Sequence, residues 1–382
     1  MGILKPLIDK LHDKGTLAHD EFVKMFELRN AEDSEYMRAM AQEIAVANYG
    51  HDIYLRGLIE FTNYCRNDCL YCGIRRSNEN AERYRLTAEE ILDCCEIGHG
   101  FGLKTFVLQG GEDMTYRDEE FCELIREIKR RFPDCAVTLS VGERSRETYE
   151  KYFDAGADRY LLRHETSSPE HYAMLHPAEL TIANRKRCLR DLKEIGFQIG
   201  AGFMVGSPYQ TYDYMAEDFE YLRELEPHMI GIGPFIHHQD TPFRDMPDGS
   251  YEETLYCLSM LRVMFPRVLL PATTALGTIH PLGREEGIRH GANVIMPSLS
   301  PKDVRKKYLL YDGKICTGEE AAECHACLER RISSIGYQVV SSRGDQADWV
   351  RKGGCRKEFI DRDSAYRDSV EREIIEEVYR RG

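Results

Sequence analysis

The sequence predicts an α/β fold, namely a complete (β/α)8 barrel of the TIM type with an N-terminal helical extension and a C-terminal extension. Three observations predict it. Short apolar runs rich in β-forming residues recur eight times from Ile53 onward, helical stretches lie between most of them, and several runs end in glycine or polar residues. Parallel strands need helical crossovers, and barrel enzymes place ligand contacts where the strands end. An open doubly wound sheet is the alternative.

The first 50 residues are expected to form a helical extension, residues 51–300 the barrel, and residues 301–382 the C-terminal extension. Amphipathic runs over 20–28 and 34–48 have helical periodicity, and the turn-like sequence AEDS at 31–34 separates them. Past Ser298 the alternation stops, and a segment rich in charge and loops follows, with a terminal helix expected over 365–381.

Within the barrel, the expected strands are apolar runs of seven to nine residues, and the expected helices have helical periodicity. The strands are expected over 53–61, 105–111, 136–142, 159–165, 198–206, 229–236, 268–275 and 292–298. The helices are expected over 88–99, 119–131, 148–155, 182–195, 214–225, 251–265 and 284–290.

Charge and composition argue against several classes of protein. The 382 residues carry a formal net charge of −14, with a pI of about 5.5. Such a surface is not built to neutralise phosphates, so we expect neither nucleic acid nor an anionic membrane as a partner. The sequence shows no secretory signal and no apolar stretch long enough to span a membrane. We therefore expect a cytoplasmic location.

Thirteen cysteines stand in the sequence, and six of them form two tight groups. A reducing cytoplasm keeps thiols free, so metal ligation is the first role to consider. The scattered cysteines are expected, for the most part, to be small core residues; they are Cys94, Cys95, Cys122, Cys135, Cys188, Cys257 and Cys355.

The first group consists of Cys65, Cys69 and Cys72 in the sequence CRNDCLYC, directly after the first expected strand. Three thiolates on a 4Fe-4S cluster leave one iron without a protein ligand. Such an iron can chelate the amino and carboxylate groups of S-adenosylmethionine (SAM) and set its sulfonium beside the cluster for electron transfer. Zinc and a redox disulfide are the alternatives. Three cysteines without a nearby fourth ligand are a poor match for a closed structural zinc site. The presence of a third thiol argues against a redox disulfide.

CRNDCLYC resembles the CxxxCxΦC signature of the radical SAM superfamily, with Tyr71 at the aromatic position. In that family the aromatic residue helps to hold the adenine, and a glycine-rich stretch that ends the second strand contacts the amino group of SAM. Gly110, Gly111 and Glu112 in VLQGGED stand at the matching place. The resemblance implies a 4Fe-4S cluster, SAM as cofactor, and reductive cleavage of SAM to a 5'-deoxyadenosyl radical.

A closer resemblance extends from about residue 50 to about residue 330. The segments LLRHETSSPEHY, GAGFMVGSPYQT, GIGPFIHHQDTP, PATTALGT, GANVIMPS and YDGKIC together resemble the HydE family of FeFe-hydrogenase maturases. These enzymes resemble biotin synthase in fold, with a complete barrel, SAM at its top and an internal cavity. The resemblance implies that Glu165 binds the ribose or amino groups of SAM and Arg185 its carboxylate. A salt bridge at the barrel rim is the alternative for both residues.

The family also implies a substrate and partners. The substrate would be a small organometallic iron species, a cysteine-bound iron carbonyl cyanide that another hydrogenase maturase supplies for the dithiolate-bridged di-iron cofactor. An electron donor would be a further partner. The residues expected to line the substrate cavity are Arg159, Arg163, Thr273, Thr274, Met296 and Tyr311. An arginine inside a barrel is costly unless it is paired or binds an anion, whereas the threonines also suit β-structure and the methionine also suits packing.

The second group consists of Cys316, Cys324 and Cys327 in CTGEEAAECHAC. In the HydE family, cysteines at this spacing can carry an accessory iron–sulfur cluster that is neither universal nor needed for activity, so we expect an optional second cluster. A zinc site with His325 or Cys355 as fourth ligand is the alternative. Free thiols without metal are another.

Two other functions compete with a HydE-type maturase. Another biotin-synthase-like radical SAM enzyme, such as a methylornithine synthase or a sulfur-inserting enzyme, shares the first cysteine group. The second cysteine group, RHET and PATTALGT favour the maturase. The other competing function is an electron carrier or cluster scaffold that catalyses no reaction. Such a protein needs no SAM pocket, so it would not explain why QGGED, Glu165 and Arg185 stand at strand ends.

Overall fold

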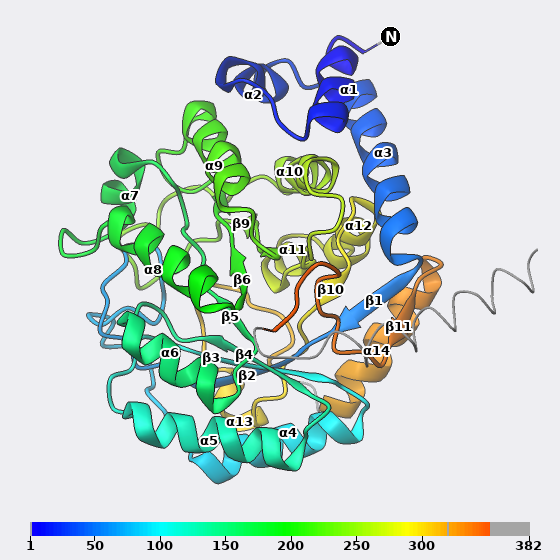
Figure 1. Ribbon diagram of the computed structural model, residues 1–382. Coiled ribbons are helices and arrows are strands. Elements are labelled where there is room, and N and C mark those ends of the chain that lie inside the picture. Colours follow the sequence, from blue (N-terminus) through cyan, green and yellow to red (C-terminus); the bar gives the residue numbers. More distant parts are fainter. Residues whose placement is uncertain (1, 319–320, 352–382) are drawn as a thin grey trace, which may run out of the picture. The chain divides into compact units, whose positions relative to one another are not determined.

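Parallel strands lie at the centre of the fold, and helices surround them (Figure 1). The computed structural model describes residues 2–318 and 321–351, without the side chains of 321–324. Residues Met1–Ala347 form one compact unit, and Asp348–Gly382 form a second unit.

Six parallel strands form the main sheet, in the order β2-β3-β4-β5-β6-β8. They are β2 (Gly57–Thr62), β3 (Thr105–Gly110), β4 (Ala136–Ser140), β5 (Arg159–Leu161), β6 (Gln198–Ala201) and β8 (Met229–Ile230). Nearly every residue of these strands is buried, because helices cover the sheet and side chains fill its other face. The prediction of an α/β fold with a parallel sheet is confirmed.

Shorter strands extend this arrangement. A three-stranded parallel sheet has the order β10-β1-β11, and β7 pairs with β9. Isolated parallel bridges join Met229 to Leu269, Pro271 to Val294 and Leu58 to Ser298. The bounds are β1 (Asp52–Leu55), β7 (Met204–Val205), β9 (Gly233–Pro234), β10 (Val294–Ile295) and β11 (Gln338–Val340).

The helices around the strands begin and end at capping residues. The Thr181 side chain accepts a hydrogen bond from the backbone N–H of Asn184 at the start of α8, and α8 ends at Gly196, whose φ of 117° suits glycine. The helices that follow β2 along the chain are α4 (Ala88–Gly100), α5 (Asp118–Arg131), α6 (Arg146–Ala155), α7 (Pro169–Leu175), α8 (Ile182–Ile195), α9 (Tyr212–Leu225), α10 (Tyr251–Met264), α11 (Thr274–Ile279), α12 (Gly283–Arg289), α13 (Lys302–Arg305) and α14 (Ala321–Ser334).

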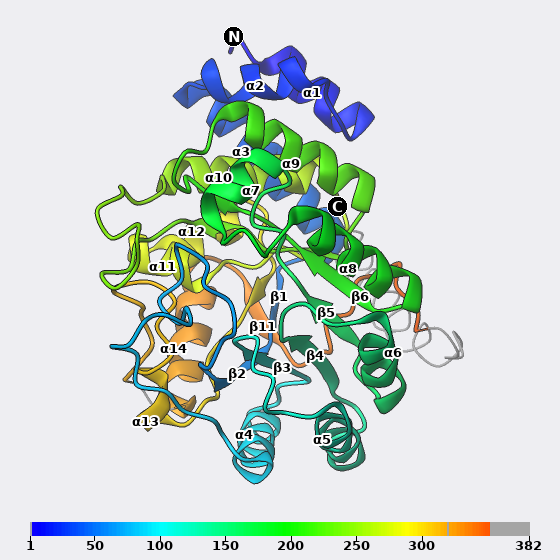
Figure 2. The same ribbon diagram turned by 90° about the vertical axis from the view of Figure 1, so that its left-hand side faces the viewer.

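Three helices precede the parallel strands and pack against α9 and α10 (Figure 2). They are α1 (Lys5–Lys14), α2 (His19–Glu27) and α3 (Ala31–Tyr49). α2 contacts α9, where Phe22 stacks on Phe219 with ring centroids 5.4 Å apart, and α3 contacts α10. No helix in the described part of the chain is long and apolar enough to cross a membrane.

Some expectations for single elements are wrong. The sequence AEDS is the first turn of α3, because Asn30 accepts from the backbone N–H of Asp33 and starts the helix there. The seventh apolar run makes only isolated bridges at Leu269 and Pro271, since proline lacks the N–H that a strand ladder needs.

The segment after Ser298 contains more regular structure than we expected, because α13, α14 and β11 all lie in it. The predicted helix over 365–381 and Cys355 lie outside the described residues. The domain boundaries at residues 50 and 300 stay predictions.

Candidate active site

The first cysteine group lies in the loop after β2, and the polar residues of this loop hold its shape. Asp68 accepts hydrogen bonds from Arg75 Nε at 2.8 Å and from the Ser77 hydroxyl at 2.8 Å. The Arg75 guanidinium holds the pKa of Asp68 far below its usual range. Arg83 ties the loop together by donating to the backbone carbonyls of Asn63, Ile74, Arg75 and Asn78. The loop is therefore organised by its own side chains.

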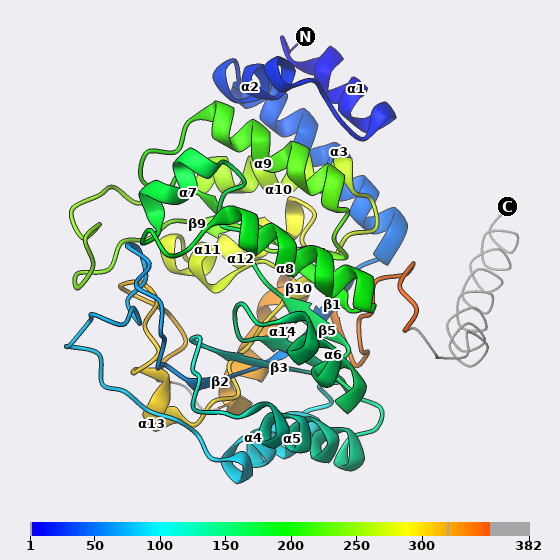
Figure 3. The same ribbon diagram turned by 60° about the vertical axis from the view of Figure 1, so that its left-hand side comes forward.

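The end of this loop is anchored to a distant segment. The backbone N–H of Gly73, next to Cys72, donates to the carbonyl of Leu310 at 2.9 Å. Figure 3 shows the loop after β2 beside the segment before α14. The segment between α13 and α14 thus supports the first cysteine group.

Burial disfavours free thiolates in this group. It raises the pKa of Cys72 to about 12, and burial together with the charges of Cys72 and Cys65 raises that of Cys69 well above its usual value. Iron cations offset this cost, because thiolates bind them as anions. The donor set therefore fits an iron–sulfur cluster.

A single tetrahedral ion fits the three cysteines less well. Zinc bonds of about 2.3 Å would bring three sulfurs close together. In the described part of the chain, three metal-ligating atoms lie within 4.8 Å of one another only at His99, Asp134 and Cys135. There Lys104 already donates to Asp134 at 2.5 Å. A cubane spaces its thiolates more widely than one ion does, so it suits the first group better.

The glycine-rich end of β3 lies against the cysteine loop. A Cβ on Gly111 would stand 2.2 Å from the carbonyl oxygen of Tyr64, so this close approach requires glycine, and one on Gly110 would stand 2.7 Å from Thr62. The backbone N–H of Glu112 donates to Cys65 Sγ at 3.4 Å. Gly111 and Glu112 therefore meet the first cysteine group, whereas Gly110 lies against β2.

The carboxylate of Glu112 is already engaged. One oxygen pairs with Arg66 at 2.9 Å and the other accepts from the backbone N–H of Glu143 at 2.8 Å. This side chain consequently fixes two loops, while the backbone around it stays next to the cysteines.

Glu165 lies in the segment after β5 and Arg185 lies in α8, and each forms an ion pair. Arg163 Nη2 lies 3.0 Å from Glu165 Oε2, and Glu165 has a φ of 66°, in the left-handed region. Arg185 Nε lies 2.5 Å from Glu143 Oε1, and its Nη1 donates to the Arg163 carbonyl at 2.5 Å. The two pairs are joined in one network.

This network lies within electrostatic reach of the cysteine loop. Burial raises the pKa of Tyr71 well above its usual value, the charges of Cys69, Glu165 and Cys72 raise it further, and that of Arg185 lowers it. The structure thus gathers Tyr71, Cys69, Cys72, Glu165 and Arg185, which the sequence predicts for cluster and SAM binding.

Five of the six residues predicted for the substrate fall into three cases. Burial raises the pKa of Tyr311, and the charges of Glu60, Arg284 and Arg163 also act on it, so Tyr311 and Arg163 lie within electrostatic reach of each other. Thr274 Oγ1 accepts from Arg284 at 3.4 Å, whereas Thr273 is the N-cap of α11 and accepts from Leu276. The Met296 side chain packs on an apolar group of Tyr49, Met229, Leu269 and Val294.

Arg159 has an internal partner. It is the first residue of β5, where it pairs with Asp345 at 2.6 Å and donates to Thr105 at 2.9 Å. The active-site loops follow the other ends of the strands. An internal carboxylate therefore accounts for the Arg159 charge, and a role of Arg159 toward the substrate stays a prediction.

Several residues of the site were not predicted from the sequence. Glu143, Tyr172 and His176 surround Arg185 and Tyr71, and Glu60 pairs with Lys314 at 2.6 Å near Tyr308. In SVGER, the carboxylate of Glu143 directly follows the strand expected over 136–142, and this position could have pointed to it. The other unpredicted residues of the site belong to no short sequence pattern.

The second cysteine group is only partly described. Cys316 has a φ of 62° and accepts from Arg284 at 3.7 Å, and Cys327 is exposed on α14. The His325 ring stacks on Phe101 with centroids 5.7 Å apart. The side chain of Cys324 lies outside the described residues, so the second cluster stays a prediction.

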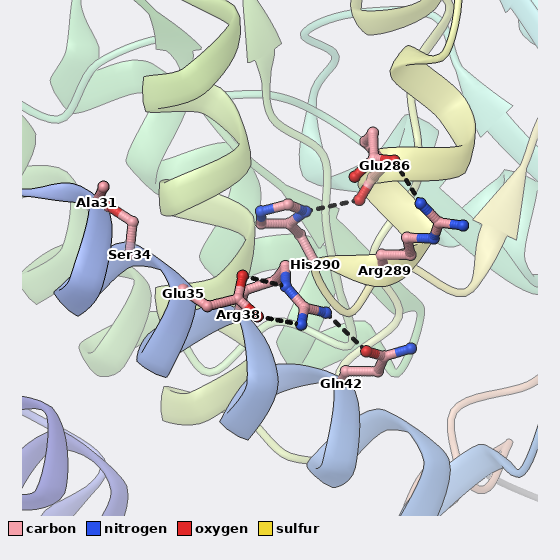
Figure 4. A pocket seen from close by; sticks show the side chains of 8 residues that line it. All are labelled: Ala31, Ser34, Glu35, Arg38, Gln42, Glu286, Arg289 and His290. Atoms are coloured by element: carbon pink, nitrogen blue, oxygen red, sulfur yellow. Dashed lines mark hydrogen bonds and ion pairs between the residues drawn. The ribbon is translucent and has the colours of Figure 1, made fainter.

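A separate surface pocket lies between α3 and α12 (Figure 4). Its charged groups are paired with one another. Arg38 donates hydrogen bonds to Glu35 and Gln42, and Arg289 forms an ion pair with Glu286. The eight residues that line it include none of those predicted for the site.

Comparison with known proteins agrees with this geometry. A family model of the Radical SAM superfamily matches residues 59–222. This chain is a radical SAM enzyme, and such enzymes use SAM and an iron–sulfur cluster. The FeFe-hydrogenase maturase subunit HydE of Thermotoga maritima is 45% identical over 326 residues, which cover 85% of this chain and 90% of that protein. The chain belongs to the HydE family.

More distant relatives are similar to this chain in sequence or in fold. The 3-methylornithine synthase of Methanosarcina acetivorans is 27% identical over 77% of this chain and 83% of its own length. The crystal structure of methylornithine synthase (PylB) has a TM-score of 0.77 at 26% identity and covers 87% of this chain and 97% of that one. HydG, a maturase of the FeFe-hydrogenase, has a TM-score of 0.75 at 21% identity over 88% of this chain and 75% of its own, and shares the fold.

Proposed function

We propose that this chain is a HydE-type maturase, which acts in the assembly of the di-iron cofactor of FeFe-hydrogenase. The observation that carries the proposal is the gathering of Cys69, Cys72, Tyr71, Glu165 and Arg185 at one place in a chain that is 45% identical to HydE. Cys65 joins them through the strand end at Glu112.

The chain's own residues would bind and orient the cluster and SAM. Cys65, Cys69 and Cys72 would hold the cluster, and Glu165 and Arg185 would hold SAM, oriented by their ion pairs with Arg163 and Glu143. The bound cluster would supply the electron that reductive cleavage of SAM requires. The side chains packed around the site would limit the access of water to the reacting groups.

A closed barrel is part of this proposal. The bridges from Met229 to Leu269, from Pro271 to Val294 and from Leu58 to Ser298 support it, because they connect the last strand of the main sheet back to its first. The hydrogen bond from the Leu58 N–H to the Pro297 carbonyl, at 2.8 Å, lies in the same seam. A complete (β/α)8 barrel would enclose the reaction on all sides.

For the substrate we propose a small organometallic iron species, bound by Arg163, Thr274 and Tyr311, with Thr273 and Met296 supporting the wall. The cationic Arg163 suits anionic ligands of such an iron centre. Other hydrogenase maturases and an electron donor would be the partners, a second cluster on the Cys316 group would be optional, and the reaction would take place in the cytoplasm.

The test is activation of an apo-hydrogenase that lacks its di-iron unit, in an anaerobic mixture of the other maturases with or without this chain. We expect hydrogen evolution only when the chain and SAM are both present. The chain of a methylornithine synthase serves as the control. Formation of methylornithine by this chain, with no hydrogenase activation, would overturn the maturase assignment.

A further inference from the structure

The short helix α7 clamps the cysteine loop. The backbone N–H of Leu70 donates to the carbonyl of Leu175 at 2.9 Å, and the Tyr71 hydroxyl lies 3.2 Å from Nε2 of His176. The Tyr71 and His176 rings meet edge to face, with centroids 5.4 Å apart and an interplanar angle of 87°. Two consecutive residues of the cysteine motif are thus held by two consecutive residues at the end of α7.

His176 links this clamp to a second tyrosine. Its Nδ1 lies 2.9 Å from the carbonyl of Tyr172, so Nδ1 carries the proton and Nε2 is left to accept from the Tyr71 hydroxyl. The Tyr172 ring stacks on the His176 ring with centroids 3.8 Å apart at 14°. Both rings are buried, with exposures of 1% for Tyr172 and 3% for His176.

The hydroxyl of Tyr172 is the last group in this series of contacts. Although it is buried, it has no hydrogen-bond partner among the described residues. A buried hydroxyl without a partner costs free energy that a bound ligand can recover. Burial raises the pKa of Tyr172, and the charges of Arg185, Glu143, Cys69 and Glu165 also act on it. Through the His176 ring on which it stacks, Tyr172 is joined to Tyr71 of the cysteine motif.

We propose that Tyr172 is a further SAM-binding residue, which donates a hydrogen bond from its hydroxyl to an oxygen or nitrogen of SAM, and that His176 is its positioning residue. This inference rests on SAM binding at the first cysteine group. It extends the site to α7, which supplies a direct contact through Tyr172 and fixes Tyr71 through His176.

The experiment measures SAM binding to the anaerobically reconstituted holoenzyme, from the change in the EPR spectrum of the reduced cluster as SAM is added. Tyr172→Phe removes only the hydroxyl, and we expect it to raise the SAM dissociation constant by about threefold to tenfold. The matched control is Tyr256→Phe. Tyr256 also has a buried hydroxyl without a hydrogen-bond partner in the described structure, but it lies on α10, beside Arg29 and Asp33. Its removal should leave SAM binding unchanged.

Two variants test the positioning role. His176→Phe keeps a ring for Tyr172 to stack on but removes the acceptor for Tyr71, so it should weaken SAM binding, and His176→Gln, which keeps an acceptor, should restore part of it. Equal SAM affinity in wild type and Tyr172→Phe would overturn the inference while leaving the proposed function intact. A wild type whose full cluster never responds to SAM would overturn both.

Discussion

Charged side chains around the cysteine loop come in pairs that hold one another before any ligand binds. Arg185 with Glu143 and Arg163 with Glu165 are the clearest examples. A buried charge without a partner is costly, so these pairs keep each head group in one orientation. Preorganised groups of this kind lose little freedom when they bind.

His176 should make the protein sensitive to acid. Burial lowers its pKa to about 3, so the folded protein keeps it neutral, whereas an unfolded chain protonates it below about 6.5. Between these two values the unfolded state binds more protons, so the free energy of unfolding falls as the pH falls. From pH 7 to pH 5.5 this single group should remove about 1.3 kcal/mol.

The measurement is the thermal unfolding midpoint at pH 7 and pH 5.5, in wild type and His176→Gln. The variant should lose less stability than wild type over this interval. His12→Asn, on the exposed surface of α1, is the control that should keep the wild-type pH dependence. An unchanged pH dependence in His176→Gln would contradict the prediction.

Spacing along the chain identifies the cysteines but not their supporting residues. Cys65, Cys69 and Cys72 form a local pattern, so one sequence reveals them. Glu143 stands 42 positions from Arg185, and only the fold brings the two together. Asp345, the partner of Arg159, lies 186 positions away, so the sequence alone does not reveal this ion pair.

The end of β3 can approach the cysteine loop only because Gly111 has no side chain. A Cβ at this position would stand 2.2 Å from the Tyr64 carbonyl oxygen and 2.8 Å from Cys65 Cβ. Gly111→Ala should therefore displace Cys65 and lower the amount of iron and sulfide bound per chain by at least about half, with most of the fold retained.

Iron and sulfide analysis after anaerobic reconstitution measures this effect. Gly100→Ala, at the end of α4, is the control, because nothing lies within 4 Å of a Cβ at that position. The control should bind the wild-type amount of iron. A full cluster in Gly111→Ala would show that the loop does not depend on this contact.

Capped elements were predicted well, and elements shaped by distant contacts were not. The helix over 182–195 matches α8, because Thr181 and Gly196 mark its ends locally. The sequence PATTALGT was interpreted as a strand end, but Thr273 caps α11, a helix of six residues. Such a short helix carries too few residues for a periodic signal.

The segment after β11 makes polar contacts at the starts of several strands. Asp345 pairs with Arg159 and accepts from Gln198, while the carbonyl of Gly344 accepts from Arg56. Both arginines are almost fully buried. These contacts join residues near the end of the compact unit to β5, to β6 and to Arg56, which lies between β1 and β2.

Asp345→Asn should destabilise the protein without affecting SAM cleavage. It leaves Arg159 buried without its carboxylate, at a cost of about 3 kcal/mol, the low end for breaking a buried pair because Asp345 keeps 27% exposure. The thermal midpoint measures the loss. Asp245→Asn, at an exposed side chain, should change neither property. Loss of SAM cleavage in a folded Asp345→Asn protein would contradict this separation of roles.

The alternation of apolar runs and helices was enough to predict the α/β class and the parallel sheet. It could not predict that β11 would join the edge of β1, since Asp52 and its partner Gln338 are separated by most of the chain. Contacts of that kind depend on the finished fold.

The central claim is that this chain cleaves SAM at a cluster held by the first cysteine group. The most direct measurement is 5'-deoxyadenosine, detected by chromatography after anaerobic reconstitution, dithionite reduction and addition of SAM, in wild type and Cys69→Ala. We expect the product from wild type and at least about a hundredfold less from the variant, because a cluster without one of its three thiolates is not held for the reaction. No product from wild type with a full cluster, or equal product from both proteins, would contradict the account.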